Sequence, residues 1–479
     1  MPSPCPMSMP PPRWSPRCWR RRGVHSGALA TPRFGDSPFR DDSVMVVAMT
    51  GVPKSMHDAD AARATLAHWF WRGLTALVFA GTLAMLFMRP VAAATPTATP
   101  GWAGTWRVAL ALPGGSLPFG LEVRQDKAGT TAYLLNAPER ARVERVSLAG
   151  DTLTLGWPSY GSELVLTRSG DSLSGEAHLS RSSGPATVAA SGVRGSWRFS
   201  PNPAAPAANI GGKWLLRYGA KNDAGLAQLT QKGSSVSGSI QLPSGDVRYL
   251  AGELSGNRLS LSTFDGNAAT LWIATLDKGA LTGAQFTATG SKTGTPWTAR
   301  PAGKDKVAPV VVEQPGGQRL AFSFPASDGR KVSLSDARYK GKVVVITLGG
   351  AWCPNCHDEA IFMGPYAARR QKEGLEVIGL HFEYGEDATR AFRLIDNYKA
   401  RYKLPYPLLL AGQPTPESTK AALGALGPVK VYPSTIFIGR DGRVREVHVG
   451  WAGPATGALN AEAKRDFDAT VSRLLREKA

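Results

Sequence analysis

The pattern of hydrophobic and polar residues divides the chain into a β-like stretch and an α/β-like stretch. From Trp102 to about Arg300, short alternating runs are separated by Gly, Ser, Thr and Asn, which is typical of antiparallel strands joined by turns. From residue 320 to residue 479, continuous apolar runs alternate with segments of helical periodicity. The pattern predicts a multidomain protein in which β-rich units precede an α/β domain.

The β-like stretch repeats itself. Gly-x-Trp motifs end at Trp106 and Trp214, which lie 108 residues apart, and residues 171–175 share a pattern with residues 279–283 at the same offset. A Pro/Ala-rich segment, residues 200–209, separates the two copies. We predict two related β-barrel or β-sandwich units.

We place these units at residues 101–199 and 209–300. Gly-x-Trp also opens lipocalin- and avidin-like barrels, which hold ligands, so a ligand-binding protein whose β units carry the function is one hypothesis. A Trp near the start of a strand more often fills a core, and we assign these units no substrate.

A linker with Pro and Gly at both ends is predicted over residues 301–319, before the α/β domain at residues 320–479. Asp441-Gly442 is a strong hairpin signal between two of its strands. The predicted elements are strands at 343–348, 375–380, 434–438 and 444–449, and helices at 354–372, 386–402 and around 467–475.

The sequence predicts a leader over residues 1–94. Part of this segment would be explained by a start codon that was chosen too early. Arg72 precedes an apolar run, residues 74–88, and small residues follow up to Ala94, in the order of a secretory signal. The run is short for a bilayer span of about 20 residues. We predict export to the periplasm, with cleavage near Ala94, or membrane association if residues 74–88 stay attached as an anchor.

Setting this leader aside changes the interpretation of charge and cysteine content. The net charge of +19 includes 11 Lys/Arg and 5 Asp/Glu within residues 1–94. The remaining positive charge is spread widely, without a basic patch interleaved with aromatics, so we predict no nucleic-acid partner. Of the four cysteines, only Cys353 and Cys356 lie beyond the leader, and so close a pair is suited to chemistry rather than to stabilising a secreted scaffold.

The segment from Cys353 to His357 reads Cys-Pro-Asn-Cys-His and fits two chemistries. As C-x-x-C it is a redox dithiol, and as C-x-x-C-H it is a c-type haem attachment site with His357 on the iron. It follows a predicted buried strand and begins a helix, whose unpaired N–H groups favour a thiolate. We assign Cys353, expected at an exposed turn, as the nucleophile and Cys356 as the resolving thiol.

The haem and zinc interpretations explain less of the chain. His357 is expected on the exposed first turn of the helix, and the surrounding α/β pattern needs no haem. A single C-x-x-C leaves a tetrahedral zinc shell incomplete. We therefore expect no cofactor and no metal.

From about Phe322 onward, the chain resembles the TlpA/ResA family of exported thiol–disulfide oxidoreductases. The resemblance covers about a third of the chain and rests on residues 322–348, on Trp-Cys-Pro-Asn-Cys at 352–356, and on Pro-Ser-Thr-Ile-Phe-Ile-Gly-Arg-Asp-Gly-Arg-Val at 433–444. It implies a thioredoxin-like fold and a redox-active Cys353–Cys356 disulfide.

The resemblance also implies roles for the residues around the cysteines. Pro433 would be a cis-proline beside the pair. Glu383, which follows the second core strand, would be the buried acid that shuttles protons for the resolving thiol. The alternative interpretation is that Glu383 is an acid on an exposed loop. The chain departs from the family at Gly349 and Gly350, where larger residues are common, and we expect extra space around Cys353. The residues expected to shape the substrate site are Trp352, Pro354, Asn355, Tyr432 and Ser434.

The resemblance implies a protein-disulfide reductase. The chain has no flavin or nicotinamide motif, so electrons would come from a transmembrane thiol reductant, and the acceptors would be exported protein disulfides or apocytochromes, as in cytochrome c biogenesis. An oxidase or isomerase of the same fold is the alternative within the class.

Overall fold

The computed structural model describes residues 101–303, 311–313 and 317–478. The predicted leader, with its apolar run 74–88 and Ala94, lies outside these residues. Within them, no helix combines the length and the apolar character needed to cross a membrane.

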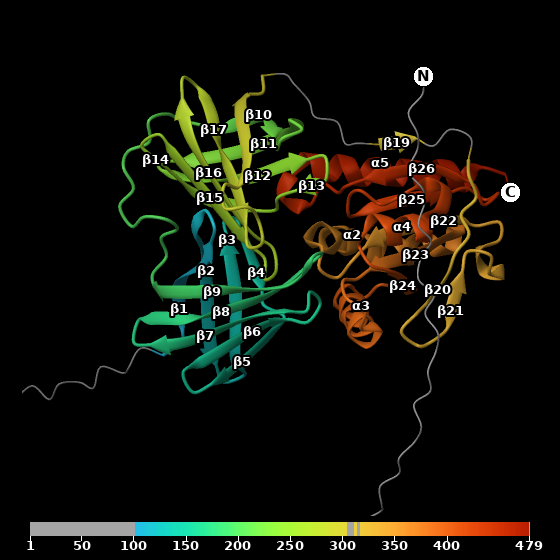
Figure 1. Cartoon of the computed structure of the whole chain (residues 1–479), viewed down its shortest axis with the longest axis horizontal. Helices are drawn as coiled ribbons and strands as arrows, with labels where there is room; N and C mark the ends of the chain where they lie inside the picture. The colour runs from blue at the N-terminus through green and yellow to red at the C-terminus, as the bar shows by residue number, and fades with distance from the viewer. Residues whose placement is uncertain (1–100, 304–310, 314–316, 479) are drawn as a thin grey trace, which may run out of the picture. The chain divides into compact units, whose positions relative to one another are not determined.

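The first β unit is a nine-stranded antiparallel sheet (Figure 1). Its strands pair in the order β4-β3-β2-β1-β9-β8-β7-β6-β5, so the sheet is open between β4 and β5. The strands are β1 (Gly104–Leu112), β2 (Gly115–Asp126), β3 (Gly129–Asn136), β4 (Glu139–Arg142), β5 (Arg145–Ala149), β6 (Thr152–Trp157), β7 (Ser162–Ser169), β8 (Ser172–Arg181) and β9 (Gly184–Arg194).

The second β unit has the same number of strands but closes into a barrel. Its order is β11-β10-β18-β17-β16-β15-β14-β12-β13, and an additional pairing of β11 with β12 joins the ends. The strands are β10 (Gly212–Tyr218), β11 (Asp223–Lys232), β12 (Ser235–Leu242), β13 (Gly245–Asp246), β14 (Leu250–Ser255), β15 (Arg258–Phe264), β16 (Ala269–Asp277), β17 (Ala280–Thr287) and β18 (Thr295–Pro301).

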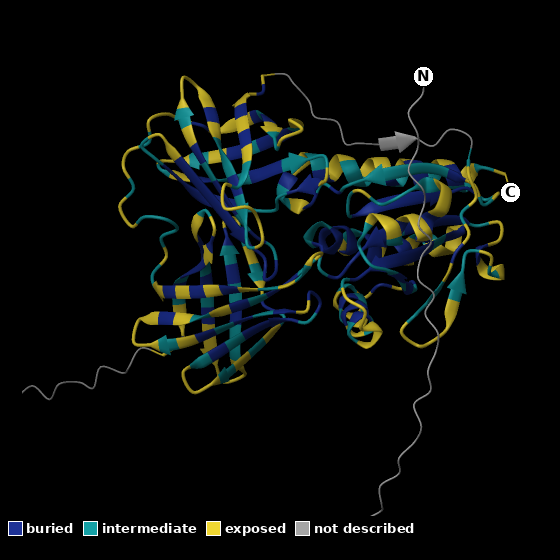
Figure 2. Ribbon diagram, in the orientation of Figure 1, coloured by how far each residue is buried: buried dark blue, intermediate teal, exposed yellow. Residues whose placement is uncertain are grey.

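Equivalent residues of the two units make equivalent contacts. The indole of Trp106 donates to the carbonyl of Trp102 at 2.8 Å, and the indole of Trp214 donates to the carbonyl of Ile210 at 2.9 Å. Both tryptophans are buried, so they fill cores rather than line open ligand sites. Buried and exposed residues alternate along the strands of both units (Figure 2), as expected for sheets with one face on a core.

The C-terminal domain is α/β and thioredoxin-like, and the predicted fold class is confirmed. Its six-stranded sheet has the order β19-β26-β25-β22-β23-β24, in which β22, β23 and β24 run parallel. The strands are β19 (Val311–Glu313), β22 (Val343–Gly349), β23 (Leu375–Phe382), β24 (Leu408–Gly412), β25 (Ser434–Ile438) and β26 (Val444–Val449), beside a separate hairpin of β20 (Ser323–Pro325) and β21 (Lys331–Ser333).

Helices cover both faces of this sheet. Val343 and Val345 of β22 pack into a core shared with α2 and α5, whereas Val344 and Ile346 pack into a second core that includes α4. The central strand is therefore buried on both faces, which explains its continuous apolar run. The helices are α2 (Pro354–Arg370), α3 (Ala388–Tyr402), α4 (Pro416–Leu423) and α5 (Ala458–Arg476), with 3-10 turns at Ala337–Tyr339, Gln371–Glu373, Gly424–Leu426 and Pro454–Thr456.

Part of the segment predicted as a linker is structured. Val311–Glu313 forms β19 and pairs with β26, with Val311 opposite His448. The short apolar run in this segment therefore extends the edge of the α/β sheet.

Candidate active site

The cysteine pair lies at the start of α2. Cys353 is the N-cap residue, Pro354 occupies the first turn, and the two cysteines form a disulfide with their Cα atoms 5.3 Å apart. The backbone N–H of Cys356 donates to the Sγ of Cys353 at 3.2 Å. In the reduced protein, this N–H and the positive end of the helix dipole favour the thiolate of Cys353.

Both cysteines are buried, which corrects the expectation that Cys353 lies at an exposed turn. Cys353 is 3% exposed and Cys356 is 2% exposed. Residues of the second β unit cover them together with residues of the α/β domain itself. A cavity of about 210 Å³ remains beside Cys353, lined by Ser244, Asp246, Val247, Arg248, Thr263, Asp265, Ala268, Thr270, Trp352, Cys353, Pro354, Asn355 and Tyr432.

Two hydrogen bonds link the cysteine loop to the second β unit. The side-chain amide of Asn267 donates to the carbonyl of Trp352 at 3.0 Å, and that of Asn355 donates to the carbonyl of Ser244 at 3.5 Å. The predicted site-shaping residues Trp352 and Asn355 therefore contact a β unit as well as the redox pair.

The predicted proline segment lies at the same end of the sheet as the cysteines. The Tyr432–Pro433 peptide bond is cis, and Ser434 pairs with Leu348 across β25 and β22. The ring of Tyr432 packs edge-on against Trp352 with centroids 5.4 Å apart. The structure thus brings Tyr432, Pro433 and Ser434 next to the strand that leads into the cysteine loop.

Gly349 and Gly350 border Cys356 and Trp352 in the structure. A Cβ at Gly349 would lie 3.3 Å from the Sγ of Cys356, and a Cβ at Gly350 would lie 2.3 Å from the indole nitrogen of Trp352. The space that a larger residue at 350 would take is filled by Trp352, whose indole donates to the carbonyl of Phe382 at 2.9 Å.

Glu383 is buried, so the exposed-loop alternative is wrong. One of its carboxylate oxygens accepts the N–H of Ala351 at 2.7 Å and lies 3.3 Å from the Nδ1 of His381. The other oxygen has no hydrogen-bond partner among the residues that the structure describes. Glu383 thus supports, through one oxygen, the loop that leads into Cys353.

A second buried acid, Glu359, was missed by the sequence reasoning. It is 4% exposed, lies one helical turn after Cys356, and accepts a hydrogen bond from the hydroxyl of Thr435 at 2.7 Å. Burial raises the pKa of Glu359 to about 7, although the Thr435 hydrogen bond opposes this shift. Its position three residues after Cys356, on the same side of a helix, was the signal that could have found it.

His357 is buried, which corrects its expected place on an exposed helical turn. Its Nε2 lies 2.7 Å from the carbonyl of Ala351, and its Nδ1 lies 2.7 Å from the hydroxyl of Tyr402. A carbonyl only accepts, so Nε2 carries the proton and Tyr402 donates to Nδ1. Burial lowers the pKa of His357 well below its ordinary value, and the ring is neutral. With both nitrogens engaged, His357 is not arranged as a haem ligand.

Arg248 of the second β unit forms a charge cluster with acids from three parts of the chain. Its guanidinium lies 3.0 Å from Asp358 on α2, 3.3 Å from Glu139 of the first unit and 3.6 Å from Asp265. Burial lowers the pKa of Arg248, but these carboxylates outweigh it and hold the pKa well above its usual value. Burial also raises the pKa of Asp358 to about 7, against the attraction of Arg248.

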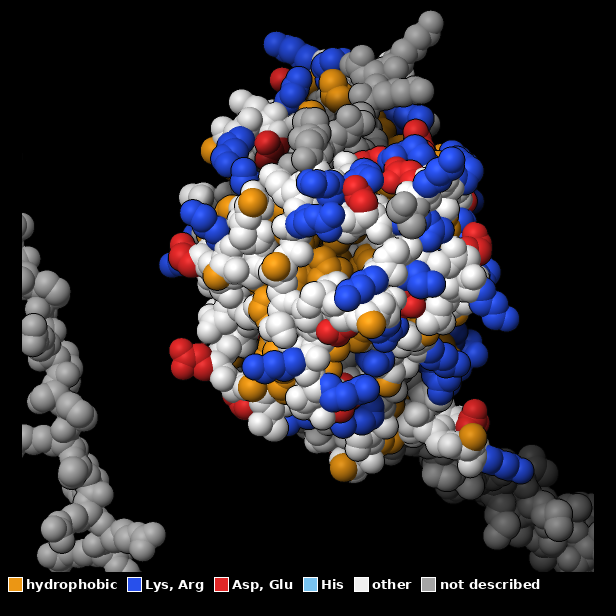
Figure 3. Space-filling model, turned by 90° about the vertical axis from the view of Figure 1, so that its right-hand side faces the viewer, with side chains coloured by type: hydrophobic (Ala, Val, Ile, Leu, Met, Phe, Trp, Pro, Cys, Tyr) orange, Lys and Arg blue, Asp and Glu red, His pale blue; other side chains and the backbone are white. Residues whose placement is uncertain are grey.

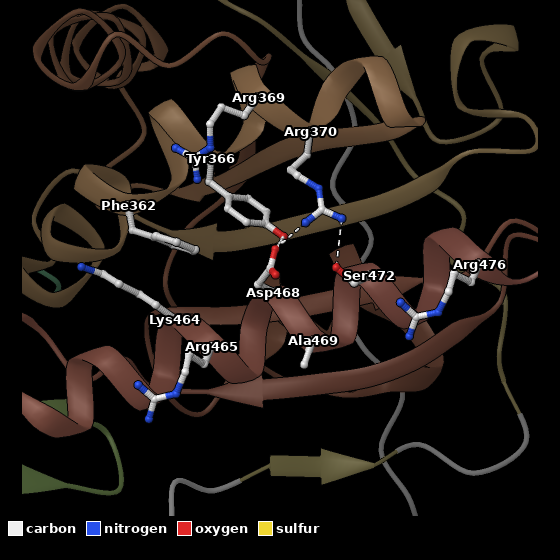
Figure 4. Close-up of a pocket in the computed structure, with 10 residues that line it drawn as sticks. All are labelled: Phe362, Tyr366, Arg369, Arg370, Lys464, Arg465, Asp468, Ala469, Ser472 and Arg476. Atoms are coloured by element: carbon white, nitrogen blue, oxygen red, sulfur yellow. Dashed lines mark hydrogen bonds and ion pairs between the residues drawn. The ribbon is translucent and has the colours of Figure 1, made fainter.

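Another cavity lies on α2 and α5, away from the cysteines (Figure 4). Its volume is about 560 Å³, and basic side chains line it, with Arg370 bound to Asp468 and Ser472. On the face shown in Figure 3, Lys and Arg are spread over the surface rather than gathered in one block. No cysteine lines this cavity, whereas Cys353 lines the smaller one described above.

Comparisons with known proteins match the α/β domain. Residues 315–447 match the model of the AhpC/TSA family. The chain is 28% identical over 137 residues to thiol-disulfide oxidoreductase ResA of Bacillus thuringiensis (strain Al Hakam), a match that covers 29% of this chain and 70% of that protein. It is 27% identical over 130 residues to the thiol:disulfide interchange protein DsbE of Pseudomonas aeruginosa, which covers 27% of this chain and 63% of that protein.

A solved structure of a thioredoxin-family thiol:disulfide interchange protein from Chlorobium tepidum TLS is 21% identical to this chain. The match covers 34% of this chain and 99% of the chain in that structure, with a TM-score of 0.27. The match to the AhpC/TSA family runs from residue 315 to residue 447. It therefore includes Cys353 and Cys356 but does not include either β unit.

Proposed function

Since residues 315–447 form a thiol–disulfide oxidoreductase domain of the ResA type, we propose that the chain is an exported protein-disulfide reductase that uses the Cys353–Cys356 dithiol. The observation that carries the proposal is the pair itself: a disulfide at the N-terminus of α2, with the Cys356 N–H donating to the Cys353 sulfur. Export is supported by the apolar run at 74–88 and the small residues up to Ala94.

The reaction runs from the reduced dithiol. The Cys353 thiolate attacks one sulfur of a substrate disulfide, forms a mixed disulfide and releases the other sulfur as a thiolate that takes up a proton. The Cys356 thiolate then attacks the Cys353 sulfur, which closes the internal disulfide and releases the second substrate thiol. The substrate gains two electrons and two protons, and an external dithiol donor returns the protein to its reduced state.

Two buried acids are suited to the proton transfers of this cycle. Cys356 must lose its proton before it attacks, and Glu359, with its pKa of about 7, lies one turn away on the same helix. A group with a pKa near the working pH is an efficient general base. We therefore assign this role to Glu359, and we propose that Glu383, with one oxygen bonded to Ala351, positions the loop and serves as a second proton carrier.

The direction of the reaction is tested by a redox titration. The full chain is equilibrated in glutathione buffers, and the state of the cysteine pair is determined by thiol alkylation and mass measurement. A midpoint near about −270 mV or lower supports a reductase, whereas a midpoint near about −120 mV would assign an oxidase instead. An absorption spectrum accompanies the titration, and a Soret band with no alkylatable thiols would replace both assignments by a haem protein.

A trapping experiment tests the chemistry at each sulfur. In the full chain, Cys356→Ser should accumulate a mixed disulfide at Cys353 with a substrate peptide, and Cys353→Ser should form none. Equal accumulation of the mixed disulfide in Cys353→Ser and in Cys356→Ser would overturn the assignment of Cys353 as the nucleophile.

A further inference from the structure

The cavity beside Cys353 is built by two domains. Cys353 and Pro354 contribute one side from α2, and Thr263 and Thr270 contribute to the other side from the barrel of the second β unit. The two threonines are directly opposite each other on β15 and β16. The barrel therefore presents a pair of neighbouring hydroxyls to the space in front of the nucleophilic sulfur.

These hydroxyls are buried but not hydrogen-bonded. Thr263 is 3% exposed, and neither its Oγ1 nor that of Thr270 has a hydrogen-bond partner in the described part of the chain. The hydroxyl of Tyr432, which also lines the cavity, has none either. Buried polar groups in native proteins are nearly always paired, so three such hydroxyls at one cavity indicate a place where a ligand supplies the partners.

The charged groups at the cavity are already satisfied by the protein. Asp265 accepts the N–H groups of Asn267 at 2.9 Å and Ala268 at 2.6 Å, and Asp246 accepts the N–H of Gly453 at 2.9 Å. Two nitrogens of Arg248 are paired with Glu139 and Asp358, while its Nε lies 3.6 Å from Asp265 without a hydrogen bond to any residue that the structure describes. Apart from this one N–H, the groups left to bind a ligand are uncharged hydroxyls that both donate and accept, which suits amide groups rather than an ion.

Arg248 holds the barrel wall in this arrangement at a conformational cost. Its φ of +57° lies in the left-handed region, which side chains other than Gly adopt rarely, and its N–H donates to Asp246 at 3.1 Å. Strained backbone of this kind is concentrated at functional sites. The strain occurs at the residue that joins the barrel to α2, next to the cavity.

We propose that the barrel of the second β unit forms a substrate subsite, in which Thr263 and Thr270 bind the amide groups that flank the cysteine of a substrate disulfide. The inference rests on the proposed reductase function and names the substrate class. The cavity of about 210 Å³ is smaller than the roughly 300–1,000 Å³ of typical ligand pockets. It therefore takes an uncharged cysteinyl residue from a small or extended peptide and excludes a disulfide held inside a folded protein.

The first test compares two small disulfides with the reduced full chain. The disulfide of N-acetyl-cysteine N′-methylamide carries flanking amides, and diethyl disulfide carries none. Thr263→Val and Thr270→Val keep side-chain size and remove one hydroxyl each. Each should raise KM for the amide-bearing disulfide about fivefold, the effect of one net hydrogen bond, and leave kcat unchanged. Neither should change the reaction with diethyl disulfide.

Thr275→Val is the matched control, because Thr275 lies exposed on the same strand as Thr270. It should behave as the wild type with both disulfides. Thermal unfolding of each variant shows whether a change in KM reflects lost structure, and Thr270→Val, at a half-buried position, keeps the test open if Thr263→Val fails to fold.

The second test asks which kind of molecule supplies the cysteinyl disulfide that binds at this subsite. The reduced wild type is given the cysteinyl amide disulfide, an unfolded protein carrying such a disulfide, and a folded protein whose disulfide is buried. Reaction with the first two and not the third is expected. Equal rates with all three substrates would overturn the proposed subsite. So would Thr263→Val and Thr270→Val proteins with the same KM for the amide-bearing disulfide as Thr275→Val. Either result would leave the proposed reductase function standing. If the reduced wild type reacts with none of them, the proposed function itself fails.

Discussion

Tyr160 of the first β unit stacks on the imidazole of His357, the residue that follows the redox pair, with ring centroids 3.7 Å apart and planes inclined by 21°. The same imidazole bonds the carbonyl of Ala351 and the hydroxyl of Tyr402. The first β unit thus contacts the cysteine helix through a ring that also fixes the start of the cysteine loop.

Replacing His357 by Phe should preserve an aromatic ring against Tyr160 and remove both hydrogen bonds. The carbonyl of Ala351 would then be buried without its partner and the hydroxyl of Tyr402 would lose its bond to the ring, so we expect a loss of about 2 kcal/mol in the free energy of unfolding. Urea denaturation measures this loss. Tyr402→Phe, which removes one of the two bonds, should cost less, and equal stability of His357→Phe and the wild type would contradict the assigned contacts.

Replacing Glu359 by Gln should change how stability depends on pH. Burial raises the pKa of Glu359 from 4.5 to about 7, so the folded state binds this proton more tightly than the unfolded state. Stability contributed by the group is therefore present below about pH 4.5, falls as pH rises to about 7, and is constant above that. At about 1.4 kcal/mol per pKa unit, Glu359→Gln should be more stable than the wild type at pH 8 by up to ~3 kcal/mol, and near equal at pH 4.5.

The measurement for Glu359→Gln is a series of urea denaturations between pH 4.5 and pH 8. Glu462→Gln serves as the control, since Glu462 is exposed on α5. A constant difference between Glu359→Gln and the wild type across this range would show that Glu359 does not titrate with a raised pKa.

Removing Arg248 should weaken the attachment of the barrel to α2. Arg248→Met would leave the carboxylates of Glu139, Asp265 and Asp358 buried close together without their cation. Breaking a buried ion pair from one side costs about 3–5 kcal/mol. We expect a loss of this size at pH 7, measured by thermal or urea unfolding.

A double-mutant cycle tests the pairing itself. Asp358→Asn in the Arg248→Met background should restore part of the lost stability, because it removes one of the opposed charges. Arg330→Met, which breaks the exposed pair with Asp328, should leave the free energy of unfolding nearly unchanged. Additive effects of the Arg248 and Asp358 changes would show that the two residues do not interact.

Gly245→Ala should loosen the cover over the cysteines. Gly245 has a φ of +124°, and a Cβ there would lie 2.0 Å from the side-chain amide of Asn355. The new methyl group would displace the Asn355 amide and break its hydrogen bond to the carbonyl of Ser244, one of the two bonds between the cysteine loop and the barrel. In the reduced protein, we expect Cys353 to react at least severalfold faster with a bulky maleimide. Gly233→Ala is the control, since its φ is also positive but no atom lies within 4 Å of the added Cβ, and its labelling rate should match the wild type.

Much of the α/β domain could be predicted because its signals are local. The apolar run of β22, the helical periodicity of α3 and α5, and the Asp441-Gly442 turn each lie within one window of sequence. Strand β24 and helix α4 were not predicted, because Leu408-Leu409-Leu410 is a run of three and α4 spans only eight residues. The sequence predicts a linker where the edge strand β19 forms, because the partner strand β26 lies far along the chain.

The cover over the active site could not be predicted for the same reason. Contacts such as Arg248 with Asp358 and Tyr160 with His357 join residues from separate domains. The sequence around each of these residues gives no sign of its partner, and no periodic pattern connects the two members of a pair. Cys353 and His357 were expected to be exposed because a helix start on an isolated domain usually faces solvent, whereas here another domain supplies the second wall.

The strand β19 also limits how far the barrel can move from the cysteines. Ala302, whose N–H donates to the carbonyl of Lys213, belongs to the barrel, and Val311 is held in the α/β sheet. Only nine peptide units separate them, so even a fully extended segment reaches about 30 Å. If the barrel leaves the redox pair, it stays at an effective concentration in the millimolar range. Closing is therefore an intramolecular event whose equilibrium does not change when the protein is diluted, and the barrel's part of the cavity wall stays available to Cys353 at any protein concentration.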